Sequence, residues 1–304
     1  MLRLSTVDLP CSVKALAVID NNRRIALVSL SGDRITVHEI DKLNTGSCSW
    51  DYSADNQTIA AIGSDSVSPD AVMSRVDNVN RVEIEKRNLL TNVVKWHRPM
   101  TGGSVHIVVI ASDGTVCVLM ISGMLELFLG ETGHRRMGID LTPQGERFCQ
   151  MNFGVLDGGH RIVFNRHSFS EYSEIVPSQK GSLRSHRLKG HIVSMVGEYA
   201  LFQPWSQTSK FAVHSFKTNE TVGECDAGDA GDAILGRSVK RASARCLRPN
   251  NMGLLEALRA TLSSVVMWPR ELSDLVYAYM PHVETAFFAD GRRMHVLQIA
   301  PVEK

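Results

Sequence analysis

Four histidines are the first residues in this sequence whose chemistry could form a metal site. His160 and His167 flank a predicted strand, and His186 and His191 lie five positions apart on a predicted turn. A zinc site needs ligands that converge on one point and carboxylates that orient them. Neither pair has that support, so we interpret these histidines as surface or turn residues.

An acidic turn offers a second kind of metal chemistry. Asp226, Asp229 and Asp232 recur at every third position, with glycines between them. Calcium takes about six to eight oxygen ligands, usually from alternate positions and a distal glutamate. That pattern is absent here. We therefore interpret the segment as a solvated loop and predict no metal site.

The sequence also lacks the common motifs of nucleophilic catalysis and nucleotide binding. It has no GxSxG turn to present a nucleophilic serine and no GxxxxGK[ST] loop to surround phosphate groups. We therefore predict no catalytic residue and no cofactor, and we expect a protein that is not an enzyme.

A basic segment contains a candidate phosphorylation site. Lys240 and Arg241 precede Ser243 by three and two residues, an arrangement that fits the acidic substrate groove of basophilic kinases. The alternative interpretation is an exposed charged loop over residues 237–248, whose few basic residues do not by themselves make a nucleic-acid-binding protein.

The composition limits the class of protein. The chain has 304 residues, of which 43% are hydrophobic and 21% charged, and its formal net charge is +1. Such a chain can form a sizeable core. It lacks the basic excess that phosphate contacts need, so we do not expect nucleic acid as a direct ligand. No apolar run reaches the roughly 18 residues of a membrane span, so we expect no membrane insertion.

The N-terminus and the cysteines indicate a location. Residues 1–8 lack the basic and apolar segments of a secretory signal. None of the six cysteines forms a CxxC pair, which argues against a zinc knuckle. We expect reduced thiols and a cytoplasmic or nuclear protein.

Short β-rich runs joined by polar turns dominate the chain. Residues 13–19, 25–30 and 35–40 are three such runs, and the Asp, Asn and Gly residues between them favour hairpins. Comparable turns begin near Asp20, Asp55, Gly102, Asp157 and Asp290. Units of about 40 to 45 residues with several strands each are typical of propeller blades, and the spacing predicts seven of them.

At residues 13–40, 105–120 and 283–299 the chain resembles the WD-repeat β-propeller family. The 283–293 segment looks like the strand–turn–strand stretch of that family, and Gly190-His191 matches its Gly-His dipeptide. Trp50-Asp51 begins a unit, whereas the family dipeptide ends a strand. The resemblance implies an all-β propeller, with Kelch-type and irregular six-bladed propellers left open. Residues 2–9 are expected to complete the last blade beside residues 294–299.

Two segments depart from the β pattern. Residues 64–81 are polar and predict a long loop. Residues 250–281 predict a helical insertion within a blade or in place of part of one, and Pro269 suits the start of its second helix. Residues 268–280 resemble the opening of an F-box. The predicted protein-binding residues of this helix are Trp268, Arg270, Leu272, Leu275, Val276 and Tyr279.

These patterns together predict a single β-propeller domain over residues 1–304. The leading functional hypothesis is a non-enzymatic interaction scaffold, or a subunit of a multi-protein assembly, whose partners are other proteins. One alternative is the substrate-recognition subunit of a ubiquitin ligase, with residues 268–280 binding an adaptor. A second alternative is a propeller enzyme with a site in the central channel, because propellers carry many activities.

Overall fold

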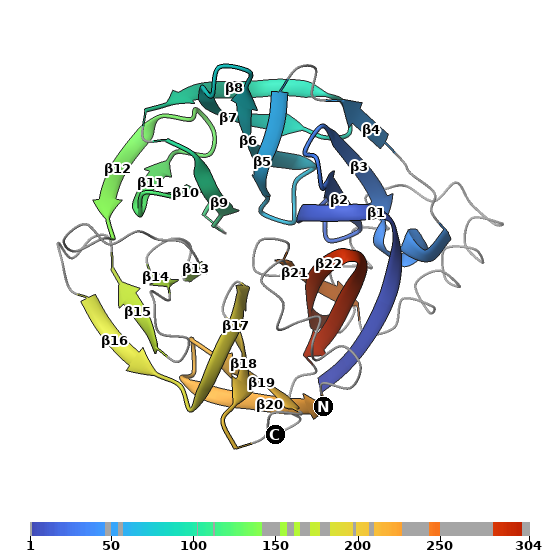
Figure 1. The fold of residues 1–304 in the computed structure, drawn as a ribbon, viewed down its shortest axis with the longest axis vertical. Coiled ribbons are helices and arrows are strands. Elements are labelled where there is room, and N and C mark those ends of the chain that lie inside the picture. Colours follow the sequence, from blue (N-terminus) through green and yellow to red (C-terminus); the bar gives the residue numbers. More distant parts are fainter. Residues whose placement is uncertain are drawn as a thin grey trace, which may run out of the picture.

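The computed structural model shows an all-β ring of blades (Figure 1). It describes residues 2–45, 50–53, 57–101, 103–111, 113–141, 153–156, 161–164, 171–176, 183–196, 199–206, 210–226, 243–249 and 282–299. These residues contain a single 3-10 helix, η1 (Ile40–Thr45), and no α-helix. No helix among them is long and apolar enough to cross a membrane.

Four blades are antiparallel sheets of four strands in sequence order. In Figure 1 the first strand of each lies near the centre and the last lies at the rim. Their strands are β5 (Gln57–Gly63), β6 (Asp70–Asp77), β7 (Val82–Asn88) and β8 (Val93–Met100); β9 (Val105–Ile110), β10 (Val116–Met120), β11 (Met124–Phe128) and β12 (Arg135–Asp140); β13 (Phe153–Leu156), β14 (Arg161–Phe164), β15 (Glu171–Ile175) and β16 (Leu183–Arg187); and β17 (Gly190–Val196), β18 (Tyr199–Pro204), β19 (Lys210–Ser215) and β20 (Glu220–Asp226).

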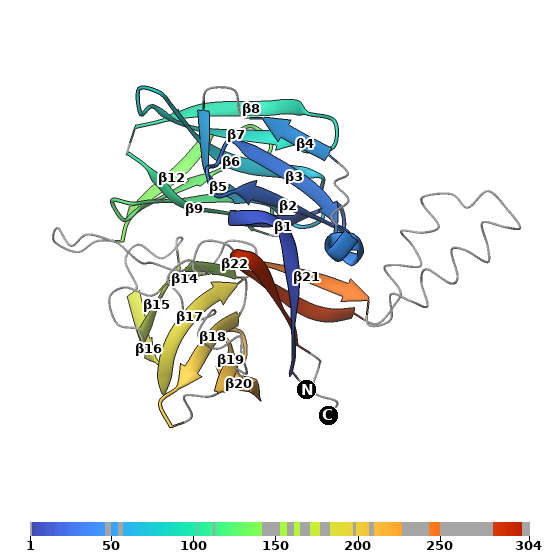
Figure 2. The ribbon, with the colours of Figure 1, turned by 45° about the vertical axis from the view of Figure 1, so that its right-hand side comes forward.

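The fifth blade closes the ring with strands from both ends of the chain. Its order is β21 (Ser243–Pro249), β22 (His282–Ile299), β1 (Leu2–Ile19), β2 (Arg24–Ser29), β3 (Arg34–Glu39) and β4 (Trp50–Ser53). The long β1 pairs with β22 through its first half and with β2 through its second (Figure 2). Residues 2–8 pair with residues 293–299, which confirms the predicted closure by the N-terminal strand.

The prediction of seven blades is wrong, because the described strands form five. The turns used to count blades were of different kinds. Asp20 directly follows β1. Asp55 and Gly102 lie outside the described residues, and the strands described on either side of each, β4 and β5 or β8 and β9, belong to different blades. The expected turn near Asp290 falls inside the continuous strand β22. The predicted helical insertion at 250–281 lies outside the described residues, so the only helix in the described part is η1.

The long loop predicted at residues 64–81 is also corrected. Residues 70–77 of this segment form β6, a central strand of its blade with five buried residues at its start. Two of those five, Asp70 and Ser74, are polar, and they hid the strand pattern in the sequence. The connection before β6, residues 64–69, and the turn after it, residues 78–81, are the parts of the segment outside the strand.

The core lies between neighbouring blades. Ile59 and Met73 of the β5–β8 blade pack with Val28 and Ile35 of the closing blade, and all four are fully buried. Trp96 joins a similar cluster between the β5–β8 and β9–β12 blades. Each fully buried aliphatic side chain contributes about 1.5 to 3 kcal/mol. The contacts between blades therefore hold the ring together, and the turns at its two faces are left to present side chains.

Candidate interaction face

The histidines and acidic residues considered for metal binding do not form a site in the described part of the chain, where no group of three His, Cys, Asp or Glu residues could hold a metal ion. His186 lies in β16 and His191 in β17, on different blades. Asp226 is the exposed last residue of β20. His160, His167, Asp229 and Asp232 lie outside the described residues.

The predicted modification and docking residues are placed only in part. Ser243 begins β21, where it pairs with Phe288, so this residue lies in a strand and not in the loop expected there. Its phosphorylation stays a prediction. The predicted docking helix, Trp268, Arg270, Leu272, Leu275, Val276 and Tyr279, lies outside the described residues.

A repeated turn presents apolar side chains on one face of the ring. Leu30, Ile121 and Trp205 directly follow β2, β10 and β18, and each of these strands forms a hairpin with the strand before it in the chain. Their side chains are 65%, 45% and 49% exposed. The position is structurally equivalent in all three blades. In each hairpin the backbone N–H of this residue donates to a carbonyl of the preceding segment, one residue before the pairing of the two strands begins. These acceptors are Ser12 at 2.9 Å, Ser104 at 2.9 Å and Lys189 at 3.2 Å, respectively.

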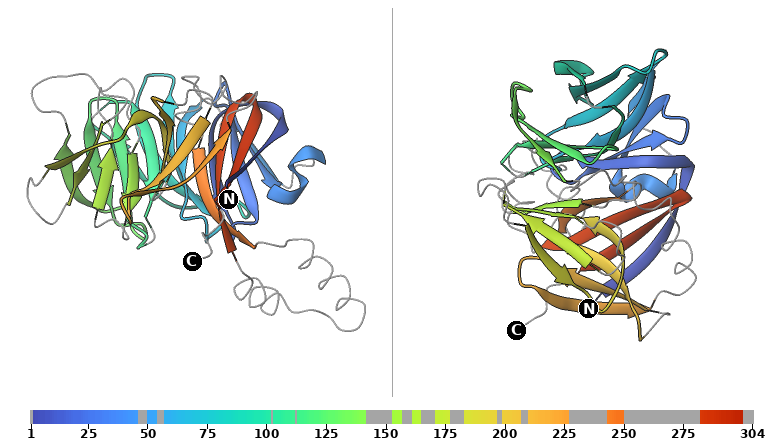
Figure 3. Two further views of the ribbon diagram at one scale, coloured as in Figure 1. Left: turned by 90° about the horizontal axis from the view of Figure 1, so that it is seen from below. Right: turned by 60° about the vertical axis from the view of Figure 1, so that its left-hand side comes forward.

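Val79 adds a fourth apolar residue to this face. It lies in the turn between β6 and β7 and is 66% exposed. Because a propeller repeats its blade around one axis, the turns after β2, β6, β10 and β18 gather on one face of the ring. Seen from the edge (Figure 3, left), the strands run between the two faces. We call Leu30, Val79, Ile121 and Trp205 the apolar ring.

The turns of the apolar ring are held by local hydrogen bonds. Asp77 accepts bonds from the backbone N–H groups of Val79 and Arg81 at 2.9 and 2.8 Å. Gly123, after Ile121, donates to the Met120 carbonyl at 3.0 Å. Gly32, after Leu30, has a φ of 80°, which favours glycine. A surface ordered in this way loses little conformational entropy when it binds a partner.

Trp205 stands in an aromatic and basic setting. The guanidinium carbon of Arg187 lies 5.7 Å from the centre of its ring, and the His191 ring meets it edge-on at 6.4 Å. A cation over an indole face stabilises the pair by about 0.5 to 1 kcal/mol at an exposed site. The indole is thus oriented at the surface, and tryptophan and arginine are enriched among residues that dominate protein interfaces.

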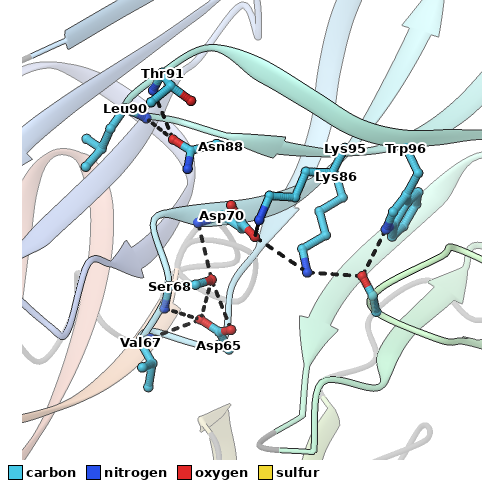
Figure 4. A network of polar contacts seen from close by, with 11 residues as sticks. Asp65, Val67, Ser68, Asp70, Lys86, Asn88, Leu90, Thr91, Lys95 and Trp96 are labelled. Carbon is cyan, nitrogen blue, oxygen red and sulfur yellow. Dashed lines mark hydrogen bonds and ion pairs between the residues drawn. The ribbon is translucent and has the colours of Figure 1, made fainter.

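Residues beneath the surface form a charged network between two blades (Figure 4). The buried Asp70 carboxylate accepts a bond from Lys95 at 2.6 Å and lies 3.6 Å from the Lys86 ammonium. Lys86 also donates to the carbonyl of Gly130 at 3.0 Å, and the Trp96 indole N–H donates to the same oxygen at 2.9 Å. This network fastens the β5–β8 blade to the β9–β12 blade, so we assign it a structural role.

A second buried cluster joins the β13–β16 and β17–β20 blades. The Tyr172 ring stacks on His186 at 4.8 Å, and its hydroxyl lies 3.4 Å from His214 Nε2. Burial raises the pKa of Tyr172 to about 12. Burial, followed by repulsion from His186, lowers the pKa of His214. The hydrogen bonds from Arg161 lower the pKa of Glu174. The cluster packs the two blades together, so we assign it a structural role.

An open groove of about 630 Å³ lies between the rim strand β8 and the turn before β12. Arg98 donates to the carbonyls of Gly133 and Thr132 at 3.2 and 3.0 Å. Arg135 is paired with Glu126 at 3.4 Å. These contacts pair the two arginines with groups of the groove wall, which Thr101 and His134 also line.

The comparisons with solved structures show the fold. A chain of the "Mitotic Checkpoint Complex" aligns at a TM-score of 0.51 and 9% identity, over 74% of this chain and 68% of that chain. U3-55K aligns at a TM-score of 0.50 and 7% identity, over 73% and 67%. BamB from Moraxella catarrhalis aligns at a TM-score of 0.46 and 16% identity, over 74% and 68%.

The resemblance to WD-repeat β-propellers is therefore confirmed at the level of the fold. No protein-family model matches the chain. No curated protein matches it either.

The apolar ring was not predicted from the sequence. A single apolar residue after a strand is ordinary, and Leu30 and Ile121 look like the last residues of apolar runs. The one local signal was Pro204-Trp205-Ser206, where a large aromatic residue enters a turn. The equivalence of the positions becomes visible only when the strand ends and their hydrogen bonds are known.

Proposed function

We propose that this chain is a non-enzymatic scaffold that binds a partner protein through the face carrying the apolar ring. The observation that carries the proposal is the repetition of Leu30, Ile121 and Trp205 at one turn position with one hydrogen-bonding pattern. Four of the nine large apolar side chains exposed in the described part of the chain belong to this ring. Apolar groups concentrated on one face mark interaction sites more often than scattered ones do.

The fold supports the proposal. A ring of blades presents a wide and rigid face, and a propeller that aligns with this chain comes from a structure of the "Mitotic Checkpoint Complex". Our proposal places the present chain in a multi-protein assembly of its own, without catalytic activity.

The test is affinity capture with matched variants on the two faces. Leu30→Asp combined with Ile121→Asp should abolish capture of the partner, because a carboxylate cannot be buried unpaired in an interface. The control is Val67→Asp combined with Val93→Asp. Both valines are exposed, Val67 in the connection between β5 and β6 and Val93 at the start of β8, at the opposite face. Retention of the partner by the first pair, or its loss with the second pair alone, would contradict the proposal.

A further inference from the structure

We propose that Thr101 is a phosphorylation site whose phosphate is held by Arg98, and that this modification weakens binding of the partner at the apolar ring. The part that concerns the ring rests on the proposed function, whereas the phosphorylation itself does not. Two features carry the inference: the exposure of Thr101 at the end of β8, and the uncompensated charge of Arg98 in the groove that both residues line.

Thr101 is accessible to a modifying enzyme. It is the exposed residue that directly follows β8, a strand at the edge of its sheet. Its hydroxyl makes no hydrogen bond with any residue that the structure describes. Gly103, two positions later, has a φ of 95°, and nothing lies within 4 Å of a Cβ placed there. The turn therefore stands clear of the blades, and the Thr101 hydroxyl is free to enter the site of an enzyme.

Arg98 supplies the sequence feature that a kinase reads. It precedes Thr101 by three residues, a spacing that fits the acidic substrate groove of basophilic kinases. Its guanidinium donates from Nε to the carbonyl of Gly133 and from Nη2 to that of Thr132. Both acceptors are neutral, so a carboxylate of a kinase replaces them by stronger, charge-assisted bonds.

The same guanidinium is placed to hold the phosphate after transfer. A guanidinium has more N–H donors than the two that are bonded here, and the carbonyl bonds fix its orientation. Arg98 makes no ion pair with any residue that the structure describes. Of the two carboxylates of this region, Glu126 is paired with Arg135 at 3.4 Å and Glu131 is exposed to solvent. A phosphate in the groove therefore meets one oriented cation whose charge is not yet compensated.

The modification is a phosphoryl transfer from a nucleoside triphosphate, catalysed by a kinase. The Thr101 hydroxyl oxygen forms a bond to the γ-phosphorus, and the bond from that phosphorus to the β–γ bridging oxygen breaks. The nucleoside diphosphate leaves with the electron pair, and the hydroxyl proton passes to the catalytic base of the kinase. The product carries a charge of about −1.5 to −2 at neutral pH.

The connection that carries Thr101 also supports the apolar ring. Ser104, at the other end of this connection, accepts a hydrogen bond from the backbone N–H of Ile121 at 2.9 Å. Arg98 compensates only part of the phosphate charge, and the remainder must be desolvated when a partner covers Ile121, which is 45% exposed. Phosphorylation of Thr101 therefore weakens binding at the ring.

The first measurement is phosphorylation of the purified chain by an arginine-directed kinase with ATP, followed by mass spectrometry that assigns each modified residue. Thr101 should be modified. Arg98→Gln should slow its modification about tenfold, because a hydrogen bond from a charged group to the kinase is lost. Arg98→Lys keeps the charge and should retain most of the rate.

Thr218 is the matched control within the same chain. It is exposed in the turn between β19 and β20, on the opposite face, and the residue three positions before it is Ser215 and not a basic residue. Thr218 should therefore stay unmodified. Circular dichroism and urea unfolding check that each variant folds.

Phosphorus NMR on the modified chain tests whether Arg98 holds the phosphate. A neighbouring guanidinium favours the dianion, so the second pKa of phosphothreonine should lie below its ordinary value of about 6. In fully modified Arg98→Gln this pKa should return to about 6.

Affinity capture tests the effect on the ring. The modified chain should bind the partner on the order of tenfold more weakly than the unmodified chain. Kinase-treated Thr101→Ala should bind the partner as the untreated chain does.

No modification of Thr101, equal modification of Thr218, or a phosphate pKa that Arg98→Gln leaves unchanged would overturn the site. Undiminished capture by the fully modified chain would overturn its effect on the ring, while loss of capture with the Leu30→Asp and Ile121→Asp pair leaves the proposed function standing. If that pair retains the partner, the proposed function fails, and the kinase and NMR results still decide whether Arg98 holds a phosphate on Thr101.

Discussion

Replacement of Asp70 by asparagine should destabilise the propeller by about 3 kcal/mol, because it removes the counter-charge of a buried lysine. The Asp70 side chain is 4% exposed and that of Lys86 14%, with 3.6 Å between carboxylate and ammonium. At an effective dielectric constant of about 20, two unit charges at this separation attract each other by roughly 4 to 5 kcal/mol before desolvation is counted. Lys95 lies closer to Asp70 but its side chain is 47% exposed, so solvent screening limits its contribution to about 1 kcal/mol or less.

The net cost follows from what the variant leaves behind. Removal of one partner from a buried pair costs about 3 to 5 kcal/mol, since the remaining charge stays desolvated. The asparagine amide keeps the shape and part of the hydrogen bonding of Asp70, which places the expected loss near the lower end of that range.

Urea unfolding followed by tryptophan fluorescence measures this cost, because the buried Trp96 shares the Gly130 carbonyl with Lys86. Two lysine variants provide the control. Lys86→Met should cost about 2 kcal/mol, because the bond to Gly130 is lost while Lys95 stays beside the Asp70 carboxylate at 2.6 Å. Lys95→Met should cost less than about 1 kcal/mol. The reasoning is refuted if Asp70→Asn costs less than about 1 kcal/mol, or if the two lysine variants cost the same.

Three further perturbations test other parts of the structure. Gly63→Ala should cost about 3 kcal/mol in urea unfolding, because a Cβ there would lie 2.3 Å from the Val108 carbonyl oxygen of the next blade. Deletion of residues 1–9 should lower the unfolding free energy by on the order of 5 kcal/mol and lower the melting temperature, since it removes seven residue pairs between β1 and β22. His214 has a pKa below its usual 6.5 in the folded chain. As the pH falls, the unfolded chain is therefore protonated at this residue before the folded chain is. Stability should therefore fall as the pH drops below 6.5, and His214→Gln should flatten that fall.

Each of these predictions has its own control. Gly103→Ala meets nothing within 4 Å of the added Cβ but stands at a φ of 95°, so it should cost about 1 to 2 kcal/mol from backbone strain alone. Equal costs for Gly63→Ala and Gly103→Ala would argue against the close approach of the blades. An unchanged melting curve after the deletion would rule out closure by β1. The pKa of Glu174 is lowered from 4.5, so a second loss of stability below that pH should persist in His214→Gln. Identical pH profiles for the two chains would show that His214 contributes nothing.

The sequence allowed the first three strands to be predicted, and the structure explains why. Residues 13–40 form hairpins whose turns at Asp20, Asn21 and Asn22 have φ values of 55°, 52° and 60°, and Asp and Asn adopt such angles more readily than other non-glycine residues. The pairing of residues 2–8 with β22 was predicted from the need of a propeller to close. The hairpin turns follow from local chemistry, and the pairing of the N-terminal strand follows from the topology.

The blade count and the interaction face depend on information that is not local. Asp70 and Ser74 are polar at buried positions of β6, and Asp70 is paired there with Lys86 of β7 and Lys95 of β8. A turn within a blade and a turn between blades use the same residue types, so spacing alone could not separate them. Leu30, Ile121 and Trp205 share no sequence motif, only a place in the fold.

Hydrogen–deuterium exchange on the captured complex tests the central claim most directly. We predict that partner binding slows exchange at the turns containing Leu30, Val79, Ile121 and Trp205, and leaves the opposite-face turns at 64–69 and 89–93 unchanged. Protection confined to the opposite face, or to the rim strands β8 and β12, would contradict the claim that this protein binds its partner through the apolar ring.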